Sequence, residues 1–499
     1  MRFSIVNQRL LPEVLGSKGI TEWQPISSFS SLASIPINST FSYFSELQQF
    51  LVGRALLLDE LPFSIEQIHC HYEHGYVTYM KGIIKRNNKW VCGRCGNDDP
   101  FYIASFPCAR CQETCTYCRR CIQMGRVSTC TPLVRWTGPD VTFQIDRDVL
   151  VWDGHLSPGQ QIASDAVVEA VRTNSDLLVW AVCGAGKTEV VFQGISEALR
   201  QNKRVCIAIP RRDVVQELTP RLQRVFPNVK VVSLYGGSEE RHTFSPLVVA
   251  TTHQLYRFYE AFDCMIVDEV DAFPYSYDKT LQWAVQKARK PKSSLILLTA
   301  TPTAQWQKEC KIGKRRHVMI PARFHRHPLP VPQLQWCGNW KKQMAKGRIP
   351  SPILRWGNER LHQQKQTLLF FPDIDLMKQA LPLFQRLNPN IEAVHADDPD
   401  RSEKVERMRK GEIPILLTTT ILERGVTIPN LDVAVIGADH SIFTESALVQ
   451  MAGRVGRSPQ YPTGNVTFFH YGLTNEMVRA VRHIQRMNTE ARKRGLING

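Results

Sequence analysis

From Leu156 onward the chain alternates short apolar runs with helical, polar-faced stretches. The runs are LLVWAV, RVCIAI, LVVATT, CMIVDE and SLILLTA, followed further along by TLLFF, IPILLTT and DVAVIGA. Short, nearly continuous apolar runs are typical of parallel strands that helices cover on both faces. A proline-rich stretch, PARFHRHPLPVPQ, divides the series into two halves. The pattern therefore predicts an α/β class with two parallel-sheet lobes joined by a linker.

The whole chain has 499 residues, too many for one hydrophobic core, which indicates two or three domains. Residues 1–68 are partly Ser-rich, carry no chemical motif and are expected to be loosely ordered or adapter-like. A helix is expected after Thr474, stopped at Gly495. The predicted divisions are an N-terminal adapter region at 1–88, a Cys-rich module at 89–135, lobes at 150–326 and 327–475, and a basic C-terminal helix at 476–499.

Composition narrows the partners and the compartment. A net charge of +16 favours a polyanionic partner, either nucleic acid or a membrane surface. Fourteen cysteines in so long a chain indicate metal ligation or burial rather than a disulfide framework. No apolar run reaches the roughly 18 residues of a spanning helix, and the first thirty residues lack the pattern of a secretory leader. We therefore expect the protein to stay in the cytoplasm unless a partner recruits it to the inner face of the cell membrane.

The stretch AVCGAGKTE, at 181–189, follows an apolar run and precedes an amphipathic helix. Its turn is made of the small residues Gly184, Ala185 and Gly186. Such a turn lets backbone N–H groups close around phosphate oxygens at a helix N-terminus. Lys187 is then expected to reach the β and γ phosphates and Thr188 to coordinate Mg²⁺. The pattern begins with Ala181 where a glycine is usual.

Two carboxylates and two arginines would complete the chemistry. In CMIVDEVD, Asp268 is expected to hold Mg²⁺ and Glu269 to polarise the attacking water. In QMAGRVGRS, Arg454 and Arg457 are three residues apart, on one face if the segment is helical, and could stabilise the γ-phosphate. Alone, the first pair is more often a solvated turn, and the second could equally be a surface feature, although its pairing with Gly453 and Gly456 favours the γ-phosphate contact. Together with the phosphate loop they predict ATP hydrolysis.

Eight stretches now form an ordered series: LSPGQ, AVCGAGKT, IPRRDVV, TTHQL, DEVD, TAT, LLTTTILERGVTIPN and QMAGRVGR. The series resembles the motifs of superfamily 2 helicases and translocases over about residues 150 to 475. The resemblance implies two RecA-like lobes that bind ATP and Mg²⁺ between them and move along nucleic acid.

The same resemblance assigns further roles. Gln160 would read adenine, Gly425 would lie at the nucleotide, and Thr299 and Thr301 would couple hydrolysis to lobe movement. The residues implied to contact the nucleic-acid backbone are Pro210, Arg211, Thr251, Thr252 and Thr419. Thr427 stands where related motors often have an aspartate, so the ribose contact and a strict preference for ATP stay open.

The segment from Pro302 to Arg360 holds 13 Lys or Arg residues against 2 acidic ones. It also holds four tryptophans, Trp306, Trp336, Trp340 and Trp356. Cations for phosphates and rings for bases are the components of a single-strand track. A solvated basic surface whose tryptophans pack inward fits the composition equally well. Trp340 and Lys341 are the predicted nucleic-acid contacts here.

Seven cysteines follow one another at short spacing. Cys92 and Cys95 form one C-x2-C knuckle, Cys108 and Cys111 form a second, and Cys115, Cys118 and Cys121 continue at the same interval. Paired knuckles suit tetrahedral Zn²⁺, and spacing alone favours the first two knuckles as one site. Buried thiols or a redox role are alternatives that fit so many cysteines poorly. His69, His71 and His74, near Cys70, are interpreted as a chance group of surface histidines rather than a metal site.

A Cys-rich module ahead of a superfamily 2 motor, ending in YCRRCIQMGR, resembles the ComFA family, the late-competence ATPases of transformable Gram-positive bacteria. GNWKK and KGRIP resemble the same family. Shorter relatives keep only the first knuckle and the one matching YCRRC, which implies Cys92, Cys95, Cys118 and Cys121 as the zinc ligands. Cys108, Cys111 and Cys115 would then contribute to a second site, with Cys130 as a fourth ligand.

The ComFA resemblance implies a function and partners. The chain would use ATP to drive single-stranded DNA inward through a ComEC-like membrane channel, working with a ComFC-like protein, and self-association is left open. One rival is a primosomal replication-restart helicase, but its cysteine cluster is inserted within the second lobe. Another is a zinc-dependent nucleic-acid adapter with a vestigial motor, which the complete set of motor residues disfavours. A nuclease is disfavoured because no separate carboxylate cluster is found.

Overall fold

The structure is a computed structural model that describes residues 1–499 except 17, 18, 21, 146–148, 425–427 and 498–499. It contains two compact units. The first consists of Met1–Asp153, Val168–Asp176 and Gln193–Leu297. The second consists of Gly154–Val167, Leu177–Phe192 and Leu298–Gly499.

Parallel strands form the helicase-like part of the first unit, in the order β12-β13-β11-β14-β15. Every residue of β11 is buried, which explains why its sequence is a continuous apolar run rather than an alternating one. The strands are β11 (Val205–Ile209), β12 (Val231–Leu234), β13 (Leu247–Thr251), β14 (Phe262–Val267) and β15 (Arg289–Thr299). Their connections include α6 (Arg212–Val225), η6 (Glu239–His242), η7 (Thr252–Arg257) and α7 (Lys279–Ala288).

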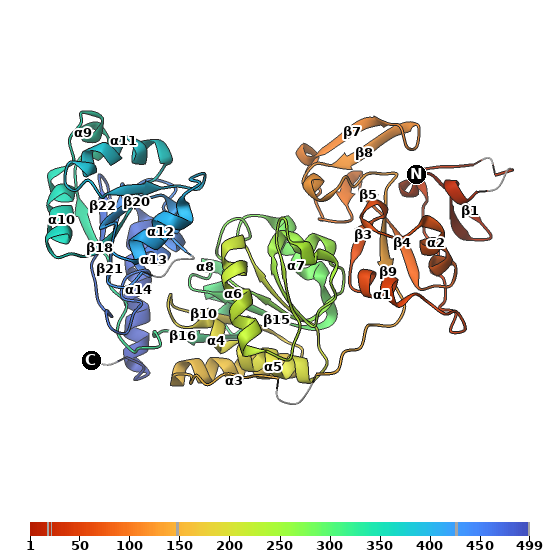
Figure 1. Ribbon diagram of the computed structural model, residues 1–499, viewed down its shortest axis with the longest axis horizontal. Coiled ribbons are helices and arrows are strands. Elements are labelled where there is room, and N and C mark those ends of the chain that lie inside the picture. Colours follow the sequence, from red (N-terminus) through yellow and green to blue (C-terminus); the bar gives the residue numbers. More distant parts are fainter. Residues whose placement is uncertain (17–18, 21, 146–148, 425–427, 498–499) are drawn as a thin grey trace. The chain divides into compact units, whose positions relative to one another are not determined.

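The N-terminal region of the first unit is built from small antiparallel sheets. β3 (Ala55–Leu57), β9 (Pro132–Trp136) and β4 (Val77–Lys81) form one sheet in the order β3-β9-β4. Three hairpins accompany it: β1–β2 (Phe3–Val6 and Arg9–Pro12), β5–β6 (Ile83–Arg86 and Lys89–Cys92) and β7–β8 (Ile103–Cys108 and Glu113–Cys118). Figure 1 shows β7 and β8 as an arm of their own, apart from the three-stranded sheet.

Residues 1–68 are more ordered than expected. The helices of this region are α1 (Ser45–Leu51) and α2 (Ile65–Glu73), with short 3-10 turns at η1 (Glu13–Leu15), η2 (Ile26–Ser28), η3 (Leu58–Glu60), η4 (Pro100–Tyr102) and η5 (Ile122–Met124). Phe3, Leu47 and Leu51 are wholly buried in one core with Tyr79 and Trp136. The expectation of loose order is therefore wrong for the parts that form β1, β2, α1 and α2, whose apolar residues pack on a core supplied by β4 and β9. The adapter-like alternative stays a prediction.

The second unit contains β10 (Asp176–Ala181), which pairs in parallel with β16 (His317–Ile320), and a six-stranded parallel sheet ordered β17-β22-β21-β18-β20-β19. The strands of that sheet are β17 (Gln333–Trp336), β18 (Gln366–Phe370), β19 (Glu392–Val394), β20 (Ile415–Thr418), β21 (Leu431–Ile436) and β22 (Val466–His470). The helices of the second unit are α4 (Lys187–Val190), α8 (Ala304–Lys311), α9 (Trp340–Ala345), α10 (Ser351–His362), α11 (Ile374–Gln385), α12 (Arg401–Arg409), η8 (Thr420–Leu422), α13 (Glu445–Ala452) and α14 (Asn475–Lys493). α3 (Pro158–Arg172) is divided between the two units, and α5 (Phe192–Arg200) belongs to the first except for Phe192.

The predicted C-terminal helix is confirmed as α14. The Thr474 side chain caps it by accepting a hydrogen bond from the backbone N–H of Met477. The helix ends at Lys493, and Gly495 adopts a left-handed conformation just beyond it. Parallel sheets with helices in both units confirm the predicted fold class, two RecA-like lobes preceded by a Cys-rich module. In the part of the chain that the structure describes, no helix combines the length and apolar character needed to cross a membrane.

Candidate nucleotide site and metal centres

The phosphate loop lies where the sequence predicts it, between β10 and α4. Gly184 and Gly186 have φ angles of 79° and 73°, left-handed values that favour glycine. Lys187 begins α4, and among the described residues it has no hydrogen bond or ion pair from its ammonium group. A strand, a tight glycine turn and an unengaged lysine at a helix start fit the binding of a nucleotide's phosphates.

Gln160 holds this loop from one side. Its side-chain amide donates a hydrogen bond to the carbonyl of Ala185 over 2.8 Å and accepts one from the backbone of Ser157. A Cβ at Gly186 would lie 2.4 Å from that amide nitrogen, so only glycine allows the approach. Gln160 is 2% exposed. Its amide therefore stabilises the loop, and its predicted contact with adenine stays a prediction.

The carboxylate pair follows β14 in the first unit. The backbone N–H of Asp268 donates to the carbonyl of Ala208 on β11, which continues the parallel pairing by one residue. Glu269 has a φ of 52°, and its backbone N–H donates to the Asp268 carboxylate over 2.7 Å. The pair thus sits at the carboxyl end of a central strand, the edge of a parallel sheet where ligands bind.

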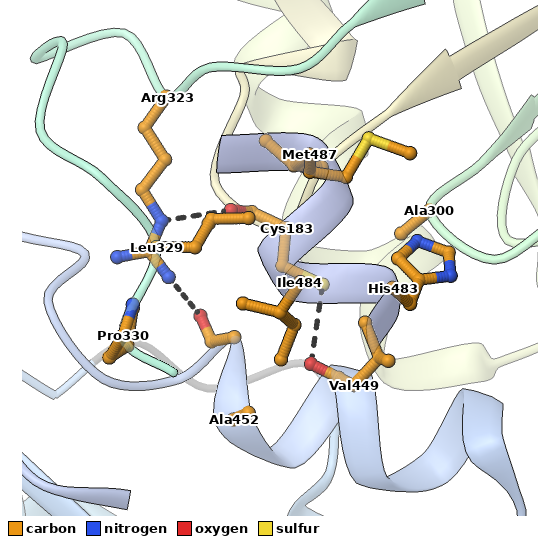
Figure 2. A pocket seen from close by; sticks show the side chains of 12 residues that line it. Cys183, Ala300, Arg323, Leu329, Pro330, Val449, Ala452, His483, Ile484 and Met487 are labelled. Carbon is orange, nitrogen blue, oxygen red and sulfur yellow. Dashed lines mark hydrogen bonds between the residues drawn. The ribbon is translucent and has the colours of Figure 1, made fainter. Parts of the chain in front are cut away.

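Arg323 links the phosphate loop to α13 and the turn after it, a role that sequence reasoning missed. Its guanidinium is 1% exposed and donates to the Cys183 carbonyl over 3.1 Å, as Figure 2 shows. It also donates to the Gly453 carbonyl over 3.0 Å and to the carbonyls of Val455 and Gly456. Burial, together with the nearby charge of Arg457, lowers the pKa of Arg323 to about 10.

The close approach at this point depends on small residues. A Cβ at Gly453 would lie 2.4 Å from the Cβ of Cys183. The Cys183 thiol in turn donates to the side-chain oxygen of Gln450 on α13 over 3.0 Å. The Thr301 hydroxyl also reaches α13, 2.7 Å from the hydroxyl of Ser446. The phosphate loop and the TAT motif therefore both contact the helix that precedes the arginine pair.

The two arginines are not on a helical face. α13 ends at Ala452, so Arg454 and Arg457 lie in the turn that follows it. Arg454 is 2% exposed and donates to the carbonyl of Glu423, whereas Arg457 is partly exposed and donates to the carbonyl of Gly453. The conditional expectation of a shared helical face is therefore wrong. Gly456, with a φ of 70°, ends the helical geometry between them.

Burial corrects two of the predicted nucleic-acid contacts. Trp340 is 2% exposed in the core of the six-stranded lobe, where its ring lies against Gly437, so it cannot stack on a base. Thr252 is wholly buried at the start of η7 and offers no surface to a phosphate. Lys341 is exposed, and so is Trp336, at 64%. The inward-packing alternative thus holds for Trp340 and Trp356 but not for Trp336.

The other predicted contacts lie in more open positions. Arg211 forms an ion pair with Asp213 and precedes α6, after Pro210 at the end of β11. Thr419 is partly exposed before η8, and Thr251, at 8% exposure, ends β13. These roles stay predictions. Gly425 and Thr427 lie outside the described residues.

Eight cysteines form two separate clusters. The knuckle cluster is Cys92, Cys95, Cys118 and Cys121, and the hairpin cluster is Cys108, Cys111, Cys115 and Cys130. All eight are buried, and within each cluster the four sulfur atoms lie within 4.8 Å of one another. The grouping agrees with the set implied by the ComFA resemblance. It contradicts the set favoured by spacing alone. The hairpins β5–β6 and β7–β8 bring Cys92 and Cys95 to Cys118 and Cys121 instead of to Cys108 and Cys111.

The knuckle cluster has the dimensions of a zinc site. Zinc–sulfur bonds of about 2.3 Å in a tetrahedron place sulfur atoms about 3.8 Å apart. The Sγ atoms of Cys92 and Cys121 are 3.8 Å apart, and those of Cys95 and Cys118 are 3.7 Å apart. The cluster thus fits a tetrahedral Zn²⁺.

The histidines near Cys70 belong to a packed core. His69 and His71 are 6% and 1% exposed on α2. The ring of His71 bonds to the Gln67 carbonyl and to the Phe44 backbone. The interpretation as surface histidines is wrong, and no metal-binding group of the described residues includes them.

Comparisons with known families agree with this geometry. Residues 39–135 match the family described as the competence protein ComFA N-terminal domain, residues 153–304 the type III restriction enzyme res subunit, and residues 352–459 the helicase conserved C-terminal domain. These helicase families support a superfamily 2 ATP-dependent enzyme. Among solved structures, the DEAD-box helicase Mss116 bound to ssRNA aligns with a TM-score of 0.50 at 15% identity, over 69% of this chain and 83% of that one.

Relatives of known name are closer in sequence. Competence protein ComFA of Bacillus subtilis is 46% identical over 92% of this chain and 99% of its own length. Competence protein ComFA of Streptococcus pneumoniae is 41% identical over 77% of this chain and 90% of its own. The transcription-repair-coupling factor of Staphylococcus haemolyticus is 26% identical over 63% of this chain but only 27% of its own length. The chain, matched along almost its whole length, belongs to the ComFA family of competence proteins.

Proposed function

We propose that the chain hydrolyses ATP to move along single-stranded DNA, and that this movement drives uptake of transforming DNA across the cell membrane during competence. The observation that carries the proposal is the Arg323 bridge. One buried guanidinium holds the carbonyls of Cys183 in the phosphate loop and of Gly453 before the arginine pair. Through Arg323, a shift of the phosphate loop would therefore move the turn that carries Arg454 and Arg457. A chain that no longer hydrolysed ATP would not need to keep this connection.

The residues of the site divide the work of hydrolysis. Lys187 would neutralise the phosphate oxygens, while Thr188 and Asp268 would hold Mg²⁺. Glu269 would accept a proton from the attacking water, and Arg454 and Arg457 would stabilise the charge that develops on the transferred group. Bound ATP supplies the phosphoanhydride bond whose cleavage releases energy. Thr301, bonded to Ser446, would transmit the change to α13.

Further parts of the proposal concern partners. The exposed Lys341 and Trp336 support a single-strand contact, because they offer a cation for phosphates and a ring for bases. The knuckle cluster would hold Zn²⁺ as a structural ion. A ComFC-like protein and a ComEC-like channel are the proposed partners at the inner face of the membrane, with self-association as a further possibility to measure.

The ATPase rate tests the motor. We expect single-stranded DNA to stimulate the purified, zinc-replete chain more than blunt duplex or RNA does. Lys187→Ala should lower the stimulated rate by about 100-fold or more, because a phosphate charge is left without its cation. Lys378→Ala, which removes an exposed lysine of α11 outside the basic segment at 302–360, is the matched control and should keep the full rate. Hydrolysis that duplex or RNA stimulates equally well would refute the single-strand assignment.

A further inference from the structure

The hairpin cluster is built from three separated parts of the N-terminal region. Cys108 ends β7, Cys111 lies in the turn, Cys115 is on β8, and Cys130 lies just ahead of β9. Their exposures are 6%, 0%, 0% and 1%. The Sγ atoms of Cys108 and Cys130 are 3.7 Å apart, the edge of a zinc tetrathiolate, and those of Cys111 and Cys115 are 3.3 Å apart.

The backbone is arranged to present these sulfurs inward. Gln112 has a left-handed φ of 59°, and its N–H donates to the Cys108 carbonyl, which closes a tight turn. A turn so shaped holds two thiolates from one bend.

Cys130 reaches the hairpin through pairing along β8. The backbone N–H of Thr129 donates to the Thr116 carbonyl over 2.9 Å, and Ser128 pairs with Tyr117. The chain thus runs beside β8 and places Cys130 at the tip of the β7–β8 hairpin. There the Ser128 hydroxyl lies 3.6 Å from the Cys130 sulfur. The fourth sulfur is therefore positioned by the fold, although it is distant in sequence from the other three.

Apolar packing is too small to hold this tip. Among the residues that the structure describes, the buried cluster there consists of the four cysteines, with Phe106 as the one partly buried apolar residue packed against it. Most other residues of β7 and β8 are exposed or half-exposed. Four thiols with so little apolar area beside them require another source of stability, and a metal supplies it in small domains.

The two clusters are independent of each other. Cys115 and Cys118 are three residues apart on β8, and successive residues of a strand point to opposite faces, so these two cysteines serve different sides. Opposite Cys115 in the hairpin register is Phe106, whereas Cys118 is opposite Ile103, near the base. No cysteine belongs to both clusters.

We propose that Cys108, Cys111, Cys115 and Cys130 form a second structural Zn²⁺ site, loaded independently of the knuckle cluster, which fastens the tip of the β7–β8 hairpin to the chain entering β9. Four buried cysteines whose sulfur atoms lie within 4.8 Å of one another suit Zn²⁺, which prefers sulfur ligands and needs no open position in a structural site.

Metal content tests the proposal directly. The full-length chain, purified under reducing conditions without a metal-binding tag, should carry two zinc ions, one for each cluster, by mass spectrometry of the metal. Paired substitution Cys108→Ser and Cys111→Ser should remove one of the two, and Cys92→Ser with Cys95→Ser should remove the other. Cys70→Ser, outside both clusters, should keep both ions.

A second measurement does not depend on whether these variants fold. X-ray absorption at the zinc edge of the wild-type chain should show four sulfur neighbours at about 2.3 Å with no nitrogen or oxygen ligand. One zinc ion per wild-type chain, iron in place of zinc, or a disulfide between Cys111 and Cys115 in the freshly reduced protein would each overturn the second site.

Discussion

The two cysteine clusters lie in one small region but differ in what surrounds them. Arg94 and Arg120, which lie between the ligands of the knuckle cluster, contact α7 in the parallel-sheet part of the first unit. Lys287 of α7 donates to the carbonyl of Arg94 over 2.6 Å, and Arg120 forms an ion pair with Asp278 at the start of α7. Within the described part of the chain, the corresponding residue of the hairpin cluster, Arg110, has its one ion pair with Asp59 of the N-terminal region, and both side chains are more than half exposed.

Residues around the knuckle cluster also contact η7, which holds most of the predicted TTHQL motif. Lys287 also donates to the carbonyl of Tyr256 over 2.7 Å. Glu60 accepts from both Arg94 and Arg257. Gly96 lies so close to Trp283 of α7 that a Cβ there would be 2.5 Å from the ring. The residues of the knuckle cluster thus join the Cys-rich module to α7 and η7, whereas the ion pair beside the hairpin cluster, Arg110 with Asp59, stays within the N-terminal region.

Removing one metal at a time should separate these roles most clearly. Cys92→Ser with Cys95→Ser should cost several kcal/mol of the stability of the N-terminal region and should speed amide exchange in α7 and η7 by about tenfold or more. Cys108→Ser with Cys111→Ser should speed exchange in β7 and β8 only. Hydrogen exchange measured by mass spectrometry checks both, and equal effects on α7 from the two pairs would remove the distinction.

Lys287 should show the next largest effect. Lys287→Met leaves two buried carbonyls, those of Arg94 and Tyr256, without their donor, which should lower the free energy of unfolding by about 2 to 3 kcal/mol. Lys279→Met, at an exposed position of the same helix, should change it by less than about 0.5 kcal/mol. Denaturant unfolding measures both variants. A stability of Lys287→Met at or above that of the wild type would show that this contact does not hold the module.

Arg120 tests the second contact of the knuckle. Its guanidinium pairs with the Asp278 carboxylate and lies 4.6 Å over the Tyr102 ring. Arg120→Ala should cost about 1 to 2 kcal/mol, since both side chains of the pair are largely buried. Arg119→Ala removes the neighbouring exposed arginine and should be close to neutral. If both substitutions had the same small effect, the ion pair would be a surface feature.

The sequence predicted those features that depend on neighbouring residues, and it missed those that depend on contacts between distant segments. The apolar runs predicted β11 and β14 because burial on both faces leaves a local pattern in the sequence. Clustered cysteines predicted metal sites, but their division required the hairpin register, which spacing does not carry. Arg323 left no local signal, since its four acceptors are backbone carbonyls from distant segments. Trp336 and Trp340 are only four residues apart, yet one is exposed and one buried.

A third attachment of the N-terminal region involves neither cluster, and it should weaken in acid. Arg54 donates to the carbonyls of His242 and Thr243 on the helicase segment, and the Phe50 ring stacks on His242 at 4.4 Å. Burial lowers the pKa of His242 to about 4, and the positive charges of Arg54, Arg241 and Arg257 add to the effect.

The sign of this pH dependence follows from the proton balance. Between the ordinary histidine pKa of about 6.5 and the folded value of about 4, the unfolded chain binds a proton that the folded chain does not, so stability should fall as pH drops through this range. His242→Gln should flatten that part of the stability profile measured by denaturant unfolding. An unchanged slope in His242→Gln would assign the acid sensitivity to other groups.

The smallest effect is expected at Arg110, and its size decides whether the hairpin cluster is as isolated as the contacts indicate. The pair with Asp59 is solvent-exposed, so Coulomb attraction is weak and Arg110→Ala should change the free energy of unfolding by less than about 0.5 kcal/mol. Asp59→Ala, the reciprocal control, should match it. A larger loss of stability on Arg110→Ala, with faster amide exchange in η3, would mean that the hairpin tip helps to hold Leu58–Glu60. Because Glu60 accepts hydrogen bonds from Arg94 and Arg257, the two clusters would then be coupled.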